Sequence, residues 1–311
     1  MTKDELKIAA QSLGFSAVGI CEATPAPHLD FFDQWVGRER HAGMDWLAAS
    51  RPLRSDPEAL LPGAQTIIAV TLDYNRPNPP VPGHPRIARY ALGRDYHKVL
   101  RGKLKRLAGL LEAEGFAARP CVDSAPIFER DYARLAGLGW FGKNTMLIDS
   151  RRGSWFFLGL LLTTASFEAD QPAEGGCGTC TRCIDACPTG AIVFADGRWG
   201  IDSGRCISYL TIEHEGAIPP ELAAQMGDWT FGCDVCQEVC PFNEERLTQP
   251  LRGAVATEPD FLRERIWPSL EEIETMSVAE WDVLTQGSAI RRTGLEGLKR
   301  NARINRRNAE S

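Results

Sequence analysis

Hydrophobic positions recur with two different periods along the first half of the chain, which predicts helices alternating with strands. Residues 95–114 carry the clearest helical pattern, with Leu100, Leu104 and Leu107 on one face and Gly115 as a stop signal. Residues 66–72 (TIIAVTL) are β-branched and apolar, as expected of a buried strand. Weaker patterns predict helices at 3–14, 34–49 (broken at Gly43), 127–135 and 278–284, and strands at 15–21, 119–122, 145–148 and 155–164. We therefore expect a layered α+β fold.

Eight of the ten cysteines lie between residues 177 and 240. The first run reads C-x2-C-x2-C-x3-C-P, an incomplete second run follows at 233–240, and Cys206 supplies the missing thiolate. In two-cluster ferredoxins the fourth cysteine of each run binds the other cluster. The spacing therefore predicts two [4Fe–4S] clusters, one held by Cys177, Cys180, Cys183 and Cys240 and the second by Cys187, Cys206, Cys233 and Cys236.

Zinc binding and disulfide formation are the alternatives for these cysteines. Structural zinc sites favour two separated C-x2-4-C pairs, and the closely spaced run C-x2-C-x2-C-x3-C-P fits that arrangement poorly. Disulfides need an oxidising compartment, and the N-terminal MTKDELKIAA has no apolar signal core. The remaining cysteines, Cys21 and Cys121, have apolar surroundings and are expected in the core.

Length and composition describe a globular protein with room for two domains: 311 residues, 43% hydrophobic and 24% charged. No apolar run approaches the roughly 20 residues of a membrane span, so we expect no membrane contact and a cytoplasmic location. The net charge of −6 is unevenly distributed, because residues 86–106 sum to +7 and residues 291–307 to +6. Such stretches suggest a polyanionic partner, although a solvated helix face and a frayed basic tail would give the same pattern.

Two segments of the first half are candidates for chemistry. Asp123 ends an apolar strand, and a carboxyl in a dry pocket has a raised pKa and can donate a proton near neutrality. The alternative is that Asp123 caps a helix beginning near Pro126. The loop G-L-G-W-F-G-K-N (137–144) contains glycines that let a backbone approach a ligand closely. This loop follows a helix, whereas a dinucleotide fingerprint follows a strand, so it indicates only that a large cofactor lies against it.

Several runs together resemble the epoxyqueuosine reductase family, in the same order from about residue 5 to 300. They are R-Y-A-L-G-R-D-Y-H (89–97), V-D-S-A-P-I-F-E-R (122–130), A-G-L-G-W-F-G-K-N (136–144), the double cysteine motif, R-C-I-S-Y-L-T (205–211) and G-S-A-I-R-R (287–292). The resemblance implies a nitroreductase-like α/β domain that holds cobalamin (1–168), a ferredoxin-like double [4Fe–4S] domain (169–245) and a short helical basic tail (246–311). It also implies the reduction of epoxyqueuosine to queuosine at the wobble position of tRNA, the last step of queuosine synthesis.

The resemblance also implies roles for single residues. The proton donor of the family, the aspartate of its V-D-S/T-x-P motif, corresponds to Asp123. Contacts with the cofactor are expected from Arg54, Arg89, Tyr90, Asp123, Gly139, Trp140, Gly142, Lys143, Asn144, Ser208 and Asp234. Contacts with nucleic acid are expected from Lys98, Arg101, Lys105, Arg291 and Arg292. The sequence contains no Asp-x-His-x-x-Gly cobalamin signature, which is consistent with a base-off corrinoid. Longer members continue after the G-S-A-I-R-R segment into HEAT-like repeats, which we expect to be absent here.

The partners implied are tRNA carrying epoxyqueuosine at the wobble position and a reductant such as a flavodoxin or a ferredoxin, and we expect a monomer. A reductive dehalogenase is the first alternative, since such enzymes share the fold and both cofactors, but they favour a tyrosine donor and a twin-arginine leader. A non-catalytic ferredoxin-like electron carrier is the second, but a carrier needs neither a large first domain nor an acid at a pocket edge. A zinc-bearing RNA-binding module is a third, weaker alternative.

Overall fold

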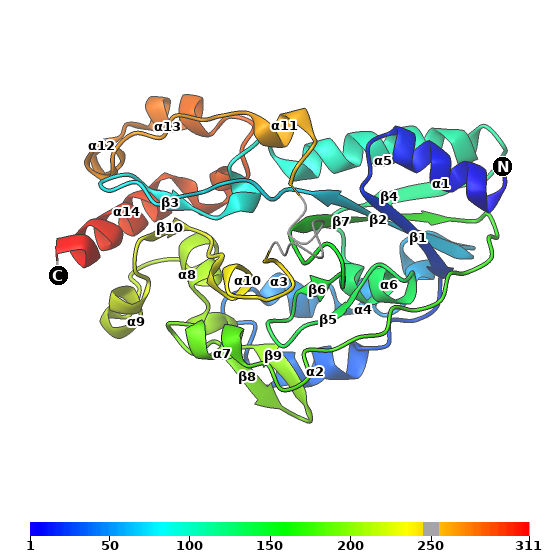
Figure 1. The fold of residues 1–311 in the computed structure, drawn as a ribbon, viewed down its shortest axis with the longest axis horizontal. Coiled ribbons are helices and arrows are strands. Elements are labelled where there is room, and N and C mark those ends of the chain that lie inside the picture. Colours follow the sequence, from blue (N-terminus) through cyan, green and yellow to red (C-terminus); the bar gives the residue numbers. More distant parts are fainter. Residues whose placement is uncertain (245–254, 311) are drawn as a thin grey trace.

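The computed structural model describes residues 1–244 and 255–310, and its centre is a four-stranded antiparallel sheet (Figure 1). The strand order is β1 (Ala17–Glu22), β2 (Thr66–Asp73), β7 (Phe156–Thr163) and β4 (Ala118–Cys121). Ile68 of β2 lies opposite Ile20 of β1 and Leu161 of β7. The strands predicted at 15–21, 66–72, 119–122 and 155–164 are thus present, and the mixed α/β character is confirmed.

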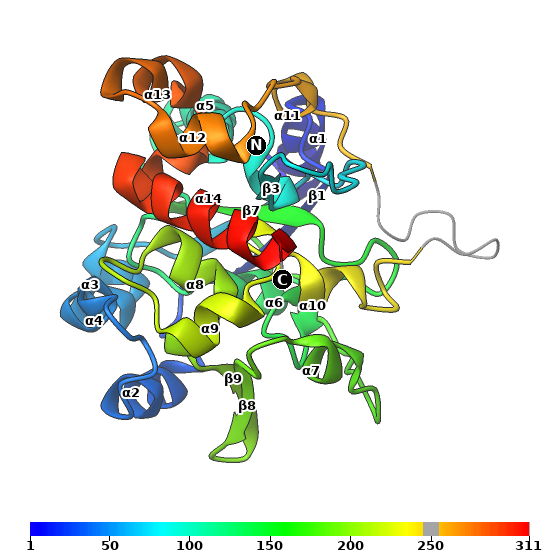
Figure 2. The same ribbon diagram turned by 90° about the vertical axis from the view of Figure 1, so that its left-hand side faces the viewer.

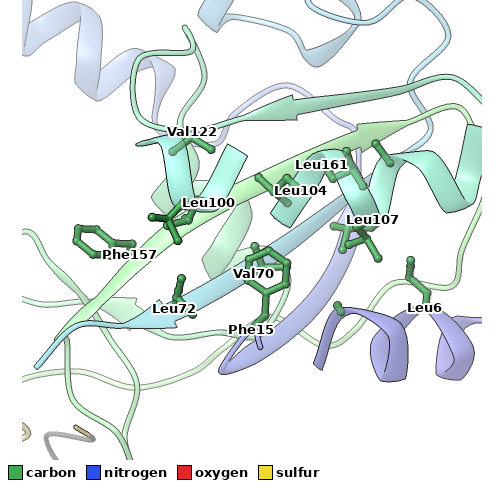
Figure 3. Close-up of a cluster of buried hydrophobic side chains, with 14 of the residues drawn as sticks. Leu6, Phe15, Val70, Leu72, Leu100, Leu104, Leu107, Val122, Phe157 and Leu161 are labelled. Atoms are coloured by element: carbon green, nitrogen blue, oxygen red, sulfur yellow. The ribbon is translucent and has the colours of Figure 1, made fainter. Parts of the chain in front are cut away.

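Both faces of the sheet are covered, which explains why β2 is apolar along almost its whole length. Ile68, Val70 and Leu72 face α1 (Lys3–Ser12) and α5 (Tyr96–Glu112) in one hydrophobic core. Figure 3 shows Leu100, Leu104 and Leu107 of α5 against this face. The alternate residues of β2, Ile67 and Ala69, join a second core that includes α6 (Glu129–Leu135) on the other face.

The helix predicted at 34–49 is wrong in its extent. The chain forms α2 (Leu29–Gly37), then turns through Glu39 and Ala42 with positive φ, and resumes as α3 (Asp45–Ala49), α4 (Arg51–Arg54) and the 3-10 turn η1 (Pro57–Ala59). The left-handed conformation at Glu39 and Ala42 is what ends the helix, and Trp35 within α2 donates a hydrogen bond from Nε1 to the carbonyl of Ile201 in the cysteine-rich part (2.6 Å).

The cysteine-rich part is built from short elements joined by loops. In order these are α7 (Arg182–Ala186), β8 (Ile192–Ala195), β9 (Arg198–Ile201), η3 (Ser203–Arg205), α8 (Ile207–Ile212), α9 (Pro220–Gln225), β10 (Trp229–Phe231) and α10 (Val235–Glu238). Strand β10 pairs in parallel with β3 (Arg86–Ile87), which precedes the turn η2 (Arg89–Ala91). The first half of the chain therefore supplies a strand to the cysteine-rich part.

The last segment contains α11 (Pro259–Leu262), α12 (Leu270–Thr275), α13 (Val278–Thr285), η4 (Ala289–Thr293) and α14 (Gly294–Glu310). Figure 2 shows α14 next to α8, and α14 also contacts β10. Asn301 of α14 is fully buried and donates to the carbonyls of Thr211 (2.7 Å) and Thr230 (3.0 Å). The basic C-terminal segment is therefore a docked helix, and the frayed tail considered as an alternative is wrong. The domain boundary predicted at 245–246 lies outside the described residues.

Candidate functional site

Asp123 stands just beyond the end of β4 and accepts hydrogen bonds from α5. Tyr96 donates through its hydroxyl (2.9 Å) and His97 through Nε2 (2.8 Å), both to Oδ2 of Asp123. The other ring nitrogen of His97, Nδ1, lies 2.8 Å from Oδ1 of Asp95. With a carboxylate at each ring nitrogen, His97 satisfies both acceptors only as the doubly protonated imidazolium. We call Asp95, Tyr96, His97 and Asp123 the acid network.

The backbone of Asp123 is held in an unusual conformation. Its φ is 40°, in the left-handed region that non-glycine residues occupy at a cost of about 1–3 kcal/mol. The amide of Asp123 donates to Oε1 of Glu129 (2.7 Å), so α6 contributes to fixing this conformation. Helix α6 begins at Glu129 without a side-chain cap. The alternative that Asp123 serves as a helix cap is therefore wrong.

The pKa values place the proton of the acid network on His97. Burial lowers the pKa of His97, but the hydrogen bonds and charges of Asp123 and Asp95 outweigh it and raise the pKa to about 9. Burial raises the pKa of Asp123, yet His97 and Tyr96 outweigh burial and lower it below its ordinary value. The raised pKa expected for Asp123 is therefore wrong in direction. Glu129 differs, because burial and the charge of Asp123 raise its pKa to about 8.

Asp123 is nevertheless open to solvent. Its side chain is 57% exposed, yet the protein around it still raises the pKa of the carboxyl through partial loss of water. Arg130 shows the same combination, being exposed while burial lowers its pKa. We use the name Asp123 cleft for the exposed surface formed by Asp123, Ser124 and Arg130. Burial lowers the pKa of Arg54, and the charges of the nearby Glu129 and Asp123 partly oppose this effect.

The first predicted set of cysteines is brought together around α7. Burial, and after it the neighbouring Cys177, Cys240 and Cys180, together raise the pKa of the Cys183 thiol to about 11. Cys177, Cys180, Cys183 and Cys240 also line one common pocket, together with Asn144. Cys240 comes from beyond α10, so the set joins segments about 60 residues apart, as the ferredoxin rule requires.

The second predicted set is grouped in the same way. Burial raises the pKa of Cys236 far above its ordinary value, and Cys233, Cys206 and Cys187 are among the neighbours that add to it. Cys183 of the first set is also a neighbour of Cys236, so the two sets are adjacent. Among the described residues, no three His, Cys, Asp or Glu side chains are arranged to hold a single metal ion.

The loop at 137–144 lies against the cysteine segments. The amide of Lys143 lies 3.3 Å from Sγ of Cys177, and Nζ of Lys143 donates to the carbonyls of Gly178 and Cys180 (2.9 Å each). Nδ2 of Asn144 donates to the carbonyl of Cys236 (3.2 Å). Two successive residues thus bind segments belonging to both cysteine sets.

The other predicted contacts in this loop have clear packing roles. A Cβ on Gly139 would lie 2.7 Å from the carbonyl oxygen of Ile148 in β6 (Leu147–Ile148), so a larger residue would not fit. A Cβ on Gly142 would lie 2.6 Å from Oδ1 of Asn144. Trp140, in β5 (Trp140–Phe141), is buried with its ring centroid 5.1 Å from that of Phe242. Their contact with a cofactor stays a prediction.

Tyr90 links the acid network to the second cysteine set. Burial raises its pKa well above the ordinary value, and Asp123 and Asp234 are the next largest causes. Asp234, between Cys233 and Val235, is buried and accepts a hydrogen bond from the amide of Arg89 (2.8 Å). Ser208 follows Cys206 by two residues, and its amide lowers the pKa of the Cys206 thiol, which burial raises. Four of the predicted cofactor residues, Arg89, Tyr90, Ser208 and Asp234, are therefore grouped beside the second cysteine set.

The predicted nucleic-acid contacts fall into two groups. Lys98, Arg101 and Lys105 are exposed on α5, and Arg101 lies 3.4 Å from the hydroxyl of Ser124 in the Asp123 cleft. Arg291 and Arg292 are instead engaged within the fold, with Asp282 (2.5 Å) and Glu213 (2.8 Å).

Sequence reasoning gave no role to four residues of this site, namely Asp95, Tyr96, His97 and Glu129. All four lie in the runs D-Y-H and F-E-R that flank the predicted helix and strand, and their acid–base side chains were the available signal. Which of them reach Asp123 depends on the packing of α5 beside β4, which the sequence pattern does not specify.

The cysteine-rich part shows the class of protein. Residues 176–243 match the family model described as a 4Fe-4S double cluster binding domain, so this chain is an iron–sulfur protein. Residues 54–124, which include the acid network, match the model described as Epoxyqueuosine reductase QueG, DUF1730. No helix of the described residues is long and apolar enough to cross a membrane.

Whole-chain similarity gives the family. The chain is 43% identical over 319 residues to epoxyqueuosine reductase of Aliivibrio fischeri, covering 98% of this chain and 82% of the relative. It is 44% identical over 294 residues to the Escherichia coli epoxyqueuosine reductase, covering 91% and 74%. A crystal structure of an epoxyqueuosine reductase with a tRNA-Tyr epoxyqueuosine-modified stem loop matches with a TM-score of 0.84 at 30% identity, covering 97% of this chain and 80% of that one. The Streptococcus thermophilus enzyme matches with a TM-score of 0.83 at 29% identity, covering 99% and 82%. This chain belongs to the epoxyqueuosine reductase family.

Proposed function

We propose that this protein reduces epoxyqueuosine to queuosine at the wobble position of tRNA, using two [4Fe–4S] clusters and cobalamin, with Asp123 as proton donor. The observation that carries the proposal is the position of Tyr90, whose ring centroid lies 6.0 Å from that of Tyr96 in the acid network and which packs against the same core as Cys206 and Cys233 of the second cysteine set. A proton source and an electron source therefore meet at one cleft. The substrate is inferred from the family relationship.

The cysteine sets supply the electrons in this proposal. Opening the epoxide to an alkene and releasing its oxygen as water consumes two electrons and two protons. Each [4Fe–4S] cluster passes one electron at a time, so the adjacent sets suit delivery in two steps. Cys187, Cys206, Cys233 and Cys236 would hold the cluster nearer Asp123, because Asp234 and Tyr90 lie on that side. A flavodoxin or ferredoxin would reduce the other cluster.

Residues near Tyr90 fit a corrinoid in their donor chemistry. Nη1 of Arg89 is buried, makes no hydrogen bond to the described residues and lies 3.8 Å from Asp234. Such a donor suits an amide or phosphate oxygen of a cofactor. Arg89, Tyr90, Ser208 and Asp234 would hold the group between Asp123 and the second cysteine set, base-off and in a nitroreductase-like domain. Bound there, cobalamin would supply low-valent cobalt as the source of electrons for reducing the epoxide.

The acid network supplies the proton. In the resting protein His97 carries the proton and Asp123 is ionised, so His97 transfers a proton to Oδ2 of Asp123 or holds it in the shared hydrogen bond (2.8 Å). The oxygen that leaves the epoxide ring becomes basic as its bond to carbon breaks, and it takes this proton from Asp123. Asp95 stabilises the imidazolium on its other side and fixes the orientation of the ring.

The tRNA would approach over α5. Lys98 and Lys105 are exposed and form no salt bridge within the described part of the chain, so they remain available for phosphates. Arg101 reaches Ser124, so the basic face of α5 is continuous with the Asp123 cleft. A wobble base turned out of the anticodon loop would then enter the cleft.

Anaerobic turnover with cobalamin, a chemical reductant and epoxyqueuosine-modified tRNA tests the proposal in wild type and Asp123→Asn. Queuosine is expected from wild type, and a loss of about 10²–10⁴-fold in the variant, the range for removing a general acid. Asp196→Asn, on the β8–β9 turn, is the matched control and is expected to be fully active. Iron content and corrinoid binding must be equal in all three proteins. Wild type that binds both cofactors and forms no queuosine would contradict the function, whereas an active Asp123→Asn would contradict only the donor.

A further inference from the structure

A hollow of about 510 Å³ lies at the junction of three segments distant in the sequence. Arg94 precedes α5, Arg263, Glu264 and Arg265 follow α11, and Gln286 and Gly287 follow α13, all of them in its wall. The wall is predominantly polar, and none of these residues belongs to the acid network, the cysteine sets or the predicted contacts.

The charge of the hollow favours an anion. Arg94 and Arg263 share one carboxylate, that of Asp260, at 2.9 and 3.0 Å. Arg265 has no acidic partner among the described residues, and its hydrogen bonds go to the carbonyls of Leu284 and Gln286. Three guanidinium groups therefore face two carboxylates, those of Asp260 and Glu264. The side chains of Arg94 and Arg263 are 46% and 70% exposed, so both can reach a ligand from outside.

The hollow is also joined to the acid network through the backbone. The amide of Asp95 donates to the carbonyl of Gly287 in the wall (2.7 Å), and Oδ1 of Asp95 lies 2.8 Å from the ring of His97. The amide of Arg94 donates to the carbonyl of Asp260 (2.9 Å). A group bound in the hollow is thus held by the same short segment that presents Tyr96 and His97 to Asp123.

We propose that this hollow binds a backbone phosphate of the RNA substrate, with Arg94, Arg263 and Arg265 as its ligands. This inference rests on the proposed function, because it assumes that tRNA is the substrate. Guanidinium groups match phosphate oxygens in bidentate geometry, and the wall offers several of them within one open hollow. The RNA strand then contacts the protein at two places, the basic face of α5 and the hollow, which together fix the wobble nucleotide at the Asp123 cleft.

The test is the affinity of an epoxyqueuosine-modified tRNA, measured by fluorescence anisotropy over a series of KCl concentrations. Arg263→Gln removes an exposed ligand and leaves Arg94 to pair with Asp260. Gln286→Glu places a negative charge in the wall and removes no ion pair. We expect each variant to bind tRNA about 3- to 10-fold more weakly, and Arg263→Gln to reduce the slope of log affinity against log salt by about one. Arg198→Gln, an exposed arginine on β9, is the matched control and should match wild type.

The outcomes separate this proposal from the proposed function. If wild type and both variants bind tRNA equally and with equal salt slopes, the hollow is not an RNA site and the reductase function stands. If wild type fails to bind tRNA at all, both inferences are overturned. Inorganic phosphate added at constant ionic strength should weaken tRNA binding by wild type more than by Gln286→Glu. If phosphate protects wild type against heat but does not compete with tRNA, the hollow binds a free anion and the RNA assignment is wrong.

Discussion

Replacing His97 by glutamine should change the pH dependence of the reaction as well as its rate. Glutamine can still donate a hydrogen bond to Asp123, but it carries no proton that it can transfer. The pKa of His97, raised to about 9 by Asp123 and Asp95, means that the pair retains its proton in roughly nine molecules of ten at pH 8. Wild type should therefore keep its rate from pH 6 to pH 8.5 and lose it above about pH 9.

In His97→Gln the proton must reside on the carboxyl of Asp123 itself. A carboxyl with the ordinary pKa of about 3.9 is protonated in about one molecule in 10⁴ at pH 8. Without His97, the burial that raises the pKa of Asp123 is opposed less, so the protonated fraction is larger than this. We expect the rate to fall by at least about 10²-fold at pH 8. The rate of the variant should rise about tenfold for each unit that the pH falls towards 6, because protonated Asp123 becomes ten times more abundant.

The assay is a single turnover of chemically reduced enzyme, with queuosine measured after nuclease digestion of the tRNA. Single turnover removes the contribution of product release, which often limits steady-state rates. His84→Gln, an exposed histidine outside the acid network, serves as the control and should show the wild-type profile. A His97→Gln profile parallel to that of wild type from pH 6 to pH 9 would refute this reasoning, since the histidine would then matter only for structure.

Two further predictions concern the parts that hold the cysteine sets. Asn301→Ala removes one of two donors from the carbonyl of Thr211, which still accepts from the hydroxyl of Thr293, and removes the Asn301 donor from the buried carbonyl of Thr230. This should cost about 1–3 kcal/mol and lower the apparent melting temperature of the cluster-loaded protein by a few degrees. An unchanged melting temperature would show that another group satisfies the carbonyl of Thr230. Lys143→Met removes the hydrogen bonds to the carbonyls of Gly178 and Cys180, so a chelator should remove iron from the first cysteine set several-fold faster. Lys143→Arg can still donate to these carbonyls and should retain most of the protection. Equal rates of iron loss in the two variants would exclude this role of Lys143.

The elements that sequence patterns predicted well are those with strong and regular periodicity. Helix α5 keeps Leu100, Leu104 and Leu107 in the core, and β2 alternates between two cores, so local pattern and tertiary environment agree. The segment 34–49 did not follow its pattern, because the left-handed turns at Glu39 and Ala42 interrupt the helix.

The candidate site was predictable to a different degree in its parts. Cysteine spacing alone led to two sets, because cluster geometry restricts which thiolates can share a cluster. The ionisation of Asp123 was not predictable, because it depends on His97, which lies 26 residues earlier and is brought into contact only by the packing of α5 beside β4. The family relationship was recognisable from short runs, and whole-chain similarity confirmed it.

The helix that holds the cysteine-rich part in place, α14, is synthesised after all of the cysteines. Thr211 and Thr230, whose carbonyls Asn301 holds, lie in the segment between Cys206 and Cys233 of the second set. Every cysteine therefore leaves the ribosome before the helix that fastens this segment. The segment between Cys206 and Cys233 can gain these two hydrogen bonds only after synthesis has passed residue 301, so this part of the fold is completed by α14, the last of the described helices to be made.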